Sequence, residues 1–252
     1  MGGGALAILG VIPARLNSTR LPGKVLRPIC GRPMLHHVYT RARRSDLLRD
    51  LVVATDSEEV FEYCTRSQIK VLMTSASHPS GTDRIHEVMG KMSADIYVNI
   101  QGDEPMIRPE HLKALLQAFL QDASVQVTTL KTPIGFEEAQ NPNCVKVVTG
   151  KDGKALYFSR FPIPYDRDQS RGGKHFKHLG IYAYSRAALE RFHQLSPSQL
   201  EEAERLEQLR FLEHGIPIHV AETPYDTIGV DTEEDLLRVE RYFERLDPSD
   251  RR

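Results

Sequence analysis

The chain has 252 residues, of which 40% are hydrophobic and 27% are charged, and its net charge at pH 7 is −1. These values are typical of an ordinary folded protein with one large α/β domain, or one domain with a sizeable insertion. With a pI near 6.8, the chain lacks the positive excess by which many proteins hold nucleic acid, so an anionic ligand would need a local cluster of cations.

The cysteines and the apolar runs indicate the cellular location of the protein. Cys30, Cys64 and Cys144 lie far apart and form no CxxC pair, which predicts reduced thiols in a cytosolic protein. The longest apolar stretch, near residues 6–12, is too short to span a bilayer and lacks the positive segment of a signal peptide. We therefore expect a cytoplasmic protein that binds neither a membrane nor nucleic acid.

Buried strands alternate with helices through the first half of the chain. Apolar runs bounded by turn residues predict the strands, and the first is Ala7–Ile12, which Pro13 is expected to end. Further strands are predicted at 51–56, 70–73, 95–100 and 125–130, helices at 33–42, 57–67 and 109–121, and a loop at 78–84. Strands interleaved with helices imply a mostly parallel sheet with right-handed crossovers.

The second half of the chain is less regular. Ser198 and Glu201 form a capping-box pattern ahead of a leucine-rich helix that Gly215 is expected to end, and Thr232 is expected to cap the last helix. The other elements predicted here are a hairpin at 145–158 and strands at 180–184 and 216–220.

The predicted organisation is a single α/β domain over residues 1–252. The sequence has no internal repeat and no low-complexity linker that would divide it. Residues 140–181, with their hairpin and polar loop, are the candidate for an inserted arm on the substrate side or at a dimer contact.

Three cations, Arg15, Arg20 and Lys24, lie in one short loop after the first strand. A loop at a strand end with cations, hydroxyls and exposed backbone N–H groups suits a polyphosphate. The loop matches neither GxxxxGK[ST] nor GxGxxG, so phosphate binding would depend on side chains and loop amides. The alternative is that these are ordinary solvated loop charges.

Two carboxylates are candidates for a metal site. Asp103 follows a buried strand and Gly102, and Asp231 lies at the junction to the last helix. Ligands of parallel sheets bind outside the carboxyl ends of the strands, where Asp103 and the cationic loop both lie. Few carboxylates with phosphate oxygens and water suit Mg²⁺, although each aspartate alone could be a surface acid. The sequence contains no GxSxG and no zinc pattern, so it gives little support for a protein nucleophile or a zinc site.

Seven segments, in chain order, match the motifs of one family. They are Pro13–Lys24, His78–Arg84, Asn99–Pro105, Ala155–Arg160, His178–Tyr182, Leu206–Arg210 and Gly229–Thr232. Over residues 7–246 the chain resembles the 3-deoxy-manno-octulosonate (Kdo) cytidylyltransferases, also called CMP-Kdo synthetases. The resemblance implies a Rossmann-like nucleotidyltransferase fold, with a mostly parallel central sheet flanked by helices, a smaller arm and a homodimer.

The resemblance also implies a reaction, in which the cytidylyl group of CTP passes to Kdo and gives CMP-Kdo and pyrophosphate for lipopolysaccharide biosynthesis. The residues that it places at CTP are Arg15, Arg20, Lys24, Ser80 and Gly81. Those that it places at Kdo are Gln101, Arg160, His178, Tyr182, Glu207 and Gln208. Asp103 and Asp231 would ligate Mg²⁺, and the catalytic residues would be Lys24, Arg15 and Asp103. Charge that builds on phosphate oxygens needs such cations, and an arginine suits the sugar carboxylate.

Two alternatives stay open at this point. A cytidylyltransferase for another sugar acid, such as neuraminate or an amino-substituted Kdo, would share the CTP site and differ at the sugar. A non-catalytic nucleotide-binding module would have less need for the two carboxylates Asp103 and Asp231. Parallel assays with different sugar acids would distinguish the three.

Overall fold

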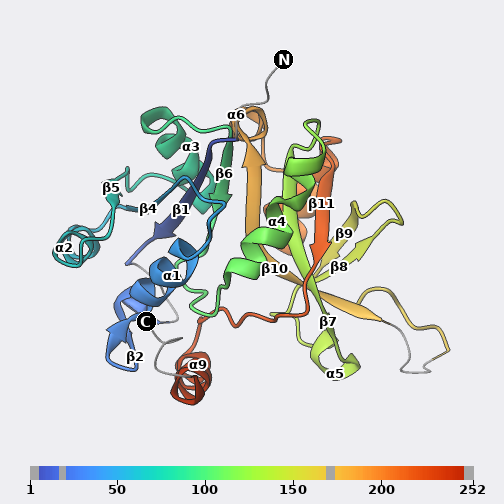
Figure 1. The fold of residues 1–252 in the computed structure, drawn as a ribbon. Helices are drawn as coiled ribbons and strands as arrows, with labels where there is room; N and C mark the ends of the chain where they lie inside the picture. Colours follow the sequence, from blue (N-terminus) through green and yellow to red (C-terminus); the bar gives the residue numbers. More distant parts are fainter. Residues whose placement is uncertain (1–5, 17–20, 169–173, 247–252) are drawn as a thin grey trace. The chain divides into compact units, whose positions relative to one another are not determined.

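The structure is a computed structural model that describes residues 6–16, 21–168 and 174–246. The described residues divide into two compact units, one with residues up to 113 together with those from 227 on, and one with residues 114–226. Both units combine helices and strands (Figure 1). Within the described ranges, no helix combines the length and the apolar character that a membrane-spanning segment requires.

The first unit is built on a parallel sheet with the strand order β6-β1-β4-β5. Its strands are β1 (Ile8–Ala14), β4 (Asp50–Thr55), β5 (Val71–Met73) and β6 (Ile96–Asn99). The central strands are nearly continuous buried apolar runs, as expected where both faces of a parallel sheet are covered. The covering elements include α1 (Met34–Arg43), α2 (Glu58–Arg66) and α3 (Gly81–Lys91).

Pro13 does not end the first strand, as the sequence suggested, but lies inside β1. The carbonyl oxygen of Val11 accepts from the backbone N–H of Ile100 at 2.9 Å, and pairing with β6 ends at Val11. Backbone groups of alternate residues point to the same side of a strand, so the nitrogen of Pro13 faces the space beyond β6. A missing N–H breaks no ladder bond there, and β1 continues beside β4 to Ala14.

The segment 78–84 is a loop only in its first half, because its second half is the first turn of α3. Ser80 is the N-cap of this helix, and its hydroxyl accepts from the backbone N–H of Asp83 at 3.1 Å. Arg84 has no exposed surface and pairs with Asp56 at 3.1 Å. A buried ion pair therefore joins α3 to the end of β4.

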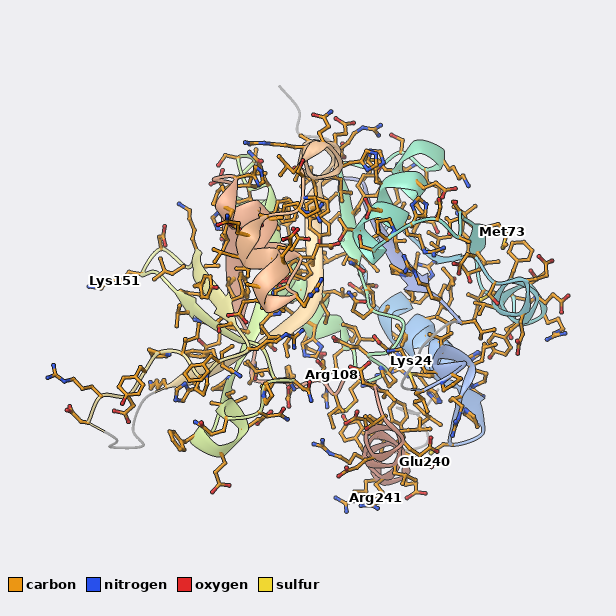
Figure 2. All side chains as sticks on the ribbon, turned by 180° about the vertical axis from the view of Figure 1, so that it is seen from behind. Lys24, Met73, Arg108, Lys151, Glu240 and Arg241 are labelled. Atoms are coloured by element: carbon orange, nitrogen blue, oxygen red, sulfur yellow. The ribbon has the colours of Figure 1, made fainter. Side chains whose placement is uncertain are left out.

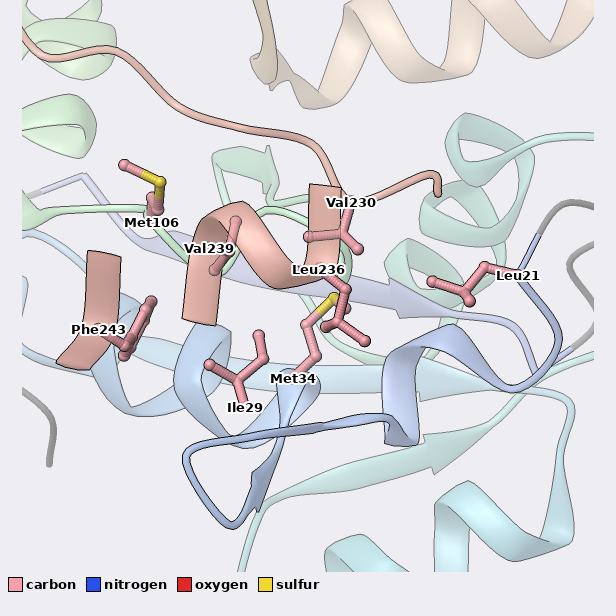
Figure 3. Close-up of a cluster of buried hydrophobic side chains, with 8 residues drawn as sticks. All are labelled: Leu21, Ile29, Met34, Met106, Val230, Leu236, Val239 and Phe243. Carbon is pink, nitrogen blue, oxygen red and sulfur yellow. The ribbon is translucent and has the colours of Figure 1, made fainter. Parts of the chain in front are cut away.

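The last helix, α9 (Glu233–Arg245), packs on the segment between β1 and α1. This segment contains the 3-10 helix η1 (Lys24–Leu26) and the two-stranded ribbon of β2 (Pro28–Ile29) and β3 (Arg32–Pro33). Figure 3 shows Leu236, Val239 and Phe243 of α9 beside Ile29 and Met34. Burial of this apolar face fixes the loop that precedes α9.

The β2–β3 ribbon turns through two residues with positive φ, Cys30 at 47° and Gly31 at 81°, as in the tight turns of hairpins. The N–H of Cys30 donates to the carboxylate of Glu240 on α9 at 3.3 Å. Cys30 is exposed, whereas Cys64 and Cys144 are buried, and all three are free thiols, as the sequence predicted. Burial raises the pKa of Cys64 to about 12 and that of Cys144 to about 11.

The second unit contains the strand order β11-β7-β10, and the hairpin of β8 and β9 continues beside β10. Its strands are β7 (Val127–Ile134), β8 (Lys146–Thr149), β9 (Ala155–Ser159), β10 (His175–Ser185) and β11 (Ile218–Glu222). Its helices include α5 (Phe136–Ala139) and α6 (Arg186–Gln194), and α4 (Pro109–Gln121) contains the boundary between the units. β7 and β11 are parallel, and the predicted hairpin is confirmed.

The leucine-rich helix predicted after Ser198 is in fact two short helices, α7 (Gln199–Glu204) and α8 (Gln208–Glu213). Ser198 is the N-cap of α7, and its backbone N–H donates to the carboxylate of Glu201 at 3.2 Å, which is one of the two contacts of the predicted capping box. Arg205 then adopts a left-handed conformation with φ 54°, which ends α7. Together the two units confirm the predicted α/β class, with a central sheet that is mostly parallel.

Candidate active site

The loop that follows β1 ends in a backbone turn that fixes the position of Lys24. Gly23 has a φ of 66°, and its N–H donates to the carbonyl of Leu16 at 3.1 Å. Only a residue without a Cβ adopts this left-handed conformation at little cost. Lys24 begins η1 directly afterwards, and the buried side chain of Val25 anchors that turn.

The ammonium of Lys24 binds both predicted metal ligands, although they come from different parts of the chain. Its Nζ contacts Oδ2 of Asp103 and lies 3.0 Å from Oδ1 of Asp231. The exposed side-chain fractions are 15% for Lys24, 26% for Asp103 and 42% for Asp231. The structure therefore brings these three predicted site residues together, and Figure 2 labels Lys24 in the first unit.

The loop of Asp103 is held close to the end of β1 by a glycine. A Cβ on Gly102 would lie 2.8 Å from the backbone oxygen of Pro13, so the backbone approach requires glycine here. The carbonyl of Asp103 also accepts from the N–H of Val230 at 2.9 Å. This bond ties the loop of Asp103 directly to that of Asp231.

The charges in this cluster affect the protonation of Lys24. Burial by itself would lower the pKa of Lys24, but the charges of Asp103 and Asp231 and their hydrogen bonds to the ammonium outweigh burial. The pKa of Lys24 therefore lies above its usual value, and the side chain is a cation at neutral pH.

The same geometry fits a divalent cation. The carboxylates of Asp103 and Asp231 converge on one cationic group, and Val230 fixes the distance between their loops. Within the described residues, no group of three or more His, Cys, Asp or Glu side chains could form a complete protein cage. Two carboxylates completed by phosphate oxygens and water are the coordination that Mg²⁺ prefers in phosphoryl chemistry.

Arg15 holds the loop that precedes α3. Its guanidinium donates to the backbone carbonyls of His78, Pro79 and Ser80, the last at 3.1 Å. A planar guanidinium can hold several acceptors in a fixed arrangement. Arg15 thus positions the loop that contains Ser80, and its predicted contact with phosphate stays a prediction. Arg20 lies outside the described residues.

Two more residues predicted at the nucleotide lie at the start of α3. The hydroxyl of Ser80 both accepts from the N–H of Asp83 and donates to its carboxylate at 2.8 Å. Gly81 lies against Pro13, where a Cβ would make ordinary van der Waals contact at 3.6 Å. Gln101, predicted at the sugar, is half-buried in this first unit, at the end of β6.

The other five residues predicted at the sugar belong to the second unit, where Arg160 follows β9. Its guanidinium donates to the carbonyls of Glu204 at 2.7 Å, Pro142 at 3.1 Å and Arg205 at 3.4 Å. A guanidinium has five N–H donors, so two remain after these contacts with described residues. The backbone of Arg160 is held by the carboxylate of Glu204 and by the fully buried Lys146, whose Nζ donates to the Arg160 carbonyl at 2.6 Å.

His178 is a neutral ring within the second unit. Burial lowers its pKa to about 3. Its Nε2 lies 3.0 Å from the hydroxyl of Thr129, and that hydroxyl is also within hydrogen-bond distance of the carbonyls of Leu179 and Ile181. In the tautomer whose Nε2 carries the hydrogen, Nε2 of His178 donates to the hydroxyl oxygen, and the hydroxyl donates to one of the two carbonyls. Nδ1 of His178 is then left as a hydrogen-bond acceptor.

Tyr182 lies beside His178, with the two ring centroids 5.3 Å apart, and stacks on Tyr184. Burial, together with the nearby Tyr184 and Glu207, raises the pKa of Tyr182 well above its usual value. Its phenol therefore stays protonated. Gln208 is also buried, and its Nε2 has no hydrogen-bond partner among the described residues.

Several residues that hold the predicted site residues were missed from the sequence. Glu204 and Thr129 give no local signal, because their partners are distant in sequence, 44 residues for Glu204 with Arg160 and 49 for Thr129 with His178. Lys146 does give a local signal in the sequence, because it lies between Val145 and Val147. A charged residue among apolar neighbours in a buried strand needs a specific partner.

Comparison with known proteins identifies the family of the chain. Residues 9–221 match the family model described as cytidylyltransferase. The chain is 58% identical over 237 residues to the 3-deoxy-manno-octulosonate cytidylyltransferase of Koribacter versatilis, covering 94% of this chain and 90% of that protein. It is 59% identical to the enzyme of the same name from Acidobacterium capsulatum, covering 94% of this chain and 96% of that protein.

A solved structure of CMP:2-keto-3-deoxy-manno-octonic acid synthetase complexed with CTP is also similar. It has 46% sequence identity and a TM-score of 0.91, and the match covers 95% of this chain and 99% of that chain. The predicted nucleotidyltransferase fold is thereby confirmed, as is the resemblance inferred from the seven motifs. The chain belongs to the cytidylyltransferase family and, within it, to the 3-deoxy-manno-octulosonate cytidylyltransferases.

Proposed function

We propose that this cytidylyltransferase transfers the cytidylyl group of CTP to Kdo and releases pyrophosphate. The observation that supports this most directly is the contact of one ammonium, that of Lys24, with two carboxylates, Asp103 and Asp231, in a chain of this family. Carboxylates can bind a metal ion and a cation beside them can bind phosphate, as a reaction that cleaves a metal-bound triphosphate requires.

The nucleotide site would use the first unit. Arg15, Arg20 and Lys24 would hold the phosphates, while Ser80 and Gly81 would lie against the cytosine and the ribose. Arg15 is already bonded to the Ser80 backbone, so one side chain could link the phosphates to the base loop. Binding CTP would then order both parts of the site at once.

Mg²⁺ would be held by Asp103 and Asp231 and would supply charge stabilisation at the phosphate oxygens. Lys24 and Arg15 would add to this stabilisation as charge builds on the leaving pyrophosphate. In the nucleotide-free chain Lys24 has a raised pKa because of its contacts with Asp103 and Asp231, so it meets the nucleotide as a cation. Its role would be to bind and orient the phosphates rather than to exchange a proton.

Within the second unit, the residues that would hold the sugar acid are Arg160, His178, Tyr182, Glu207 and Gln208, while the sugar contact of Gln101, in the first unit, stays a prediction from the sequence. Arg160 retains two N–H donors after its contacts with described carbonyls, which is what a bidentate contact with a carboxylate needs. Neutral His178 offers Nδ1 as an acceptor for a sugar hydroxyl. Buried Gln208 offers an amide nitrogen that has no hydrogen-bond partner among the described residues.

In the reaction, the anomeric hydroxyl of the sugar attacks the α-phosphorus of CTP in line. A sugar O–P bond forms, the bond from the α-phosphorus to the bridging oxygen of pyrophosphate breaks, and the hydroxyl proton is lost to solvent. No protein nucleophile is needed. The side chains of the chain bind, orient and stabilise charge.

The experiment that tests this function measures pyrophosphate release with CTP and Mg²⁺ in parallel reactions with Kdo, an amino-substituted Kdo and neuraminate. We expect turnover with Kdo to be the fastest. Turnover with neuraminate and none with Kdo would overturn the substrate assignment. No turnover with any sugar acid, together with tight CTP binding, would favour a non-catalytic nucleotide-binding module.

A variant tests the role given to Asp103. We expect Asp103→Ala to lower kcat at least about 100-fold, because one of two metal ligands and one partner of Lys24 are lost. The control is Asp46→Ala, which removes an exposed carboxylate of the same unit and should keep normal turnover. Near-normal turnover of a folded Asp103→Ala protein would remove this residue from the metal site.

We also infer that two copies associate through the arm. A cavity of about 360 Å³ in the second unit is lined by a mixture of apolar and polar side chains. Two aromatic residues of this lining, Phe161 and Tyr165, are 72% and 76% exposed. Exposed aromatic rings that border one cavity are typical of a contact surface. The closed two-fold dimer is the commonest way for a chain to bury such a surface.

The association is tested by the mass in solution, measured by light scattering after size-exclusion chromatography. Phe161→Ser with Tyr165→Ser should shift the dimer to the monomer. Leu156→Ser is the matched control, because Leu156 is 66% exposed on β9 but does not line the cavity. A monomeric wild-type protein would contradict the inference. The cytoplasmic location and the role in lipopolysaccharide biosynthesis stay predictions.

A further inference from the structure

The position of Lys24 bears on when a metal can bind. Its ammonium lies at the point on which the carboxylates of Asp103 and Asp231 converge, the position that suits a divalent ion. The backbone holds it there, since the N–H of Lys24 donates to the carbonyl of Leu21 at 3.2 Å and η1 begins at this residue. The single positive charge of Lys24 thus offsets part of the negative charge of the two carboxylates.

A divalent ion would have to compete with this ammonium. If the ammonium stays, it repels the incoming ion at close range, and if it leaves, its contacts with two carboxylates are lost. The side chain of Lys24 is only 15% exposed, so water screens the repulsion less than it would at the surface. Among the described residues, Asp103 and Asp231 are also the side-chain acceptors that Lys24 contacts.

A triphosphate changes this competition. Its oxygens are strong acceptors for an ammonium, and they can also complete the coordination of a metal held by two carboxylates. When Lys24 turns to the phosphates, its ammonium leaves the position between the two carboxylates, and a divalent ion can take that position. The arrival of the nucleotide therefore removes a competitor of the metal and supplies further ligands at the same time.

We propose that Lys24 makes metal binding conditional on the nucleotide, by occupying the carboxylates of Asp103 and Asp231 until a triphosphate draws it away. The inference rests on the metal site described under the proposed function. Binding free energies are reciprocal, so the metal would strengthen nucleotide binding by the same factor. Free metal would then not fill the site of the nucleotide-free protein.

The test measures binding of Mn²⁺ to the whole chain without nucleotide, by the electron paramagnetic resonance signal of free Mn²⁺. Lys24→Met keeps the length of the side chain and removes its charge. We expect this variant to bind Mn²⁺ at least about tenfold more tightly than the wild type. Lys24→Arg, which keeps the charge, should bind as weakly as the wild type.

The matched control is Lys70→Met. Lys70 also pairs with an aspartate of the first unit, Asp50, so this variant removes the same charge and one ion pair away from the site. It should bind Mn²⁺ like the wild type. Equal tightening by Lys70→Met would mean that net charge alone is responsible, and it would overturn the proposal.

The double variant Lys24→Met/Asp103→Asn shows whether the ion that Lys24→Met binds lies at the carboxylates. If it loses the tight binding, the ion in Lys24→Met sits at the carboxylates, as proposed. If Lys24→Met binds no more tightly than the wild type, the gating role is overturned. Mn²⁺ binding at Asp103 in both proteins would then leave the metal site of the proposed function intact.

Folding of the variants is followed by thermal unfolding with and without Mn²⁺. Lys24→Gln provides a second neutral side chain in case Lys24→Met does not fold. Without metal, either neutral variant should melt at a lower temperature than the wild type, because the contacts of the Lys24 ammonium with two carboxylates are lost. Mn²⁺ should raise its melting temperature and leave that of the nucleotide-free wild type nearly unchanged. Equal shifts in both proteins would contradict the proposal.

Discussion

One methyl group added at Gly102 would collide with the backbone of β1. The added Cβ would lie 2.8 Å from the carbonyl oxygen of Pro13, and a backbone atom inside a sheet cannot turn aside as a flexible side chain can. The loop would have to shift, and Asp103 is the next residue. The position of Asp103, the proposed metal ligand, is thus set by the absence of a side chain on the residue before it.

We expect Gly102→Ala to lower the free energy of unfolding by about 1–3 kcal/mol, the usual cost of overpacking, and to lower turnover with CTP at least about tenfold. Chemical denaturation and pyrophosphate release measure the two effects. Gly90→Ala is the control, because an added Cβ there meets no atom within 4 Å. It lies in α3 and should be neutral or stabilising by about 0.5–1 kcal/mol. Normal activity of Gly102→Ala would show that the loop moves without disturbing Asp103.

The partners of a single charged residue are hard to predict from the sequence. Lys24 was predicted to bind phosphate, and its contacts with Asp103 and Asp231 were not foreseen, because they join residues 79 and 207 positions apart. The residue types at a site follow from motifs. The contacts that they make with one another before a ligand arrives depend on the folded chain.

At the scale of elements, α9 acts as the support of the loop that contains Asp231. The face of Leu236, Val239 and Phe243 is buried against the segment around Ile29. The same segment begins with η1, which contains Lys24. One apolar cluster therefore anchors two of the three charged groups of the site.

We expect Phe243→Ala to lower the free energy of unfolding by about 3–5 kcal/mol, the usual cost of removing a buried ring. In the fraction that stays folded, turnover should fall because the loop before α9 loses its support. Leu237→Ala, on the exposed side of the same helix at 46% exposure, should change stability by less than about 0.5 kcal/mol. Equal effects of the two variants in denaturation and turnover would argue against this role of α9.

Local signals predicted elements well, and tertiary contacts explain the failures. The cap residues Ser198 and Thr232 start helices as their short motifs predict. The extension of β1 past Pro13 depends on where β6 ends. The break at Arg205 depends on a left-handed residue other than glycine, and residues of that type give no reliable signal in the sequence.

The whole molecule should lose stability in mild acid, in part because of His178. This histidine is neutral in the folded chain because burial lowers its pKa to about 3, whereas an unfolded histidine takes up a proton near pH 6.5. Between these values the unfolded state binds more protons, so stability falls as the pH falls. Glu87, whose hydrogen bonds with Lys91, His78 and Ser75 outweigh burial and lower its pKa to about 2, acts in the same direction at lower pH.

We therefore expect His178→Gln to show a shallower loss of stability than the wild type between about pH 6.5 and pH 3. Urea denaturation at several pH values measures the slope. His193→Gln, which changes an exposed histidine of α6, should keep the slope of the wild type. A slope that does not change in His178→Gln would mean that His178 is protonated alike in the folded and unfolded chains.

The α/β class of the whole molecule could be predicted because strand and helix periodicities alternate along the chain. The family could be predicted because its seven motifs keep their order. The hydrogen-bond partners of the buried charged residues could not be predicted from the sequence. Lys146 donates to two backbone carbonyls at 2.6 and 3.0 Å, and the apolar pattern of its strand does not indicate which carbonyls these are.

The three thiols differ in a way that has a practical consequence. Cys30 is exposed in the β2–β3 turn, while the pKa values of Cys64 and Cys144 are raised to about 12 and 11 by burial, which makes them poor nucleophiles. A maleimide dye should therefore label the unmodified chain at one position. Because the N–H of Cys30 donates to Glu240 of α9, the fluorescence of that dye would report whether α9 stays docked as nucleotide and metal bind.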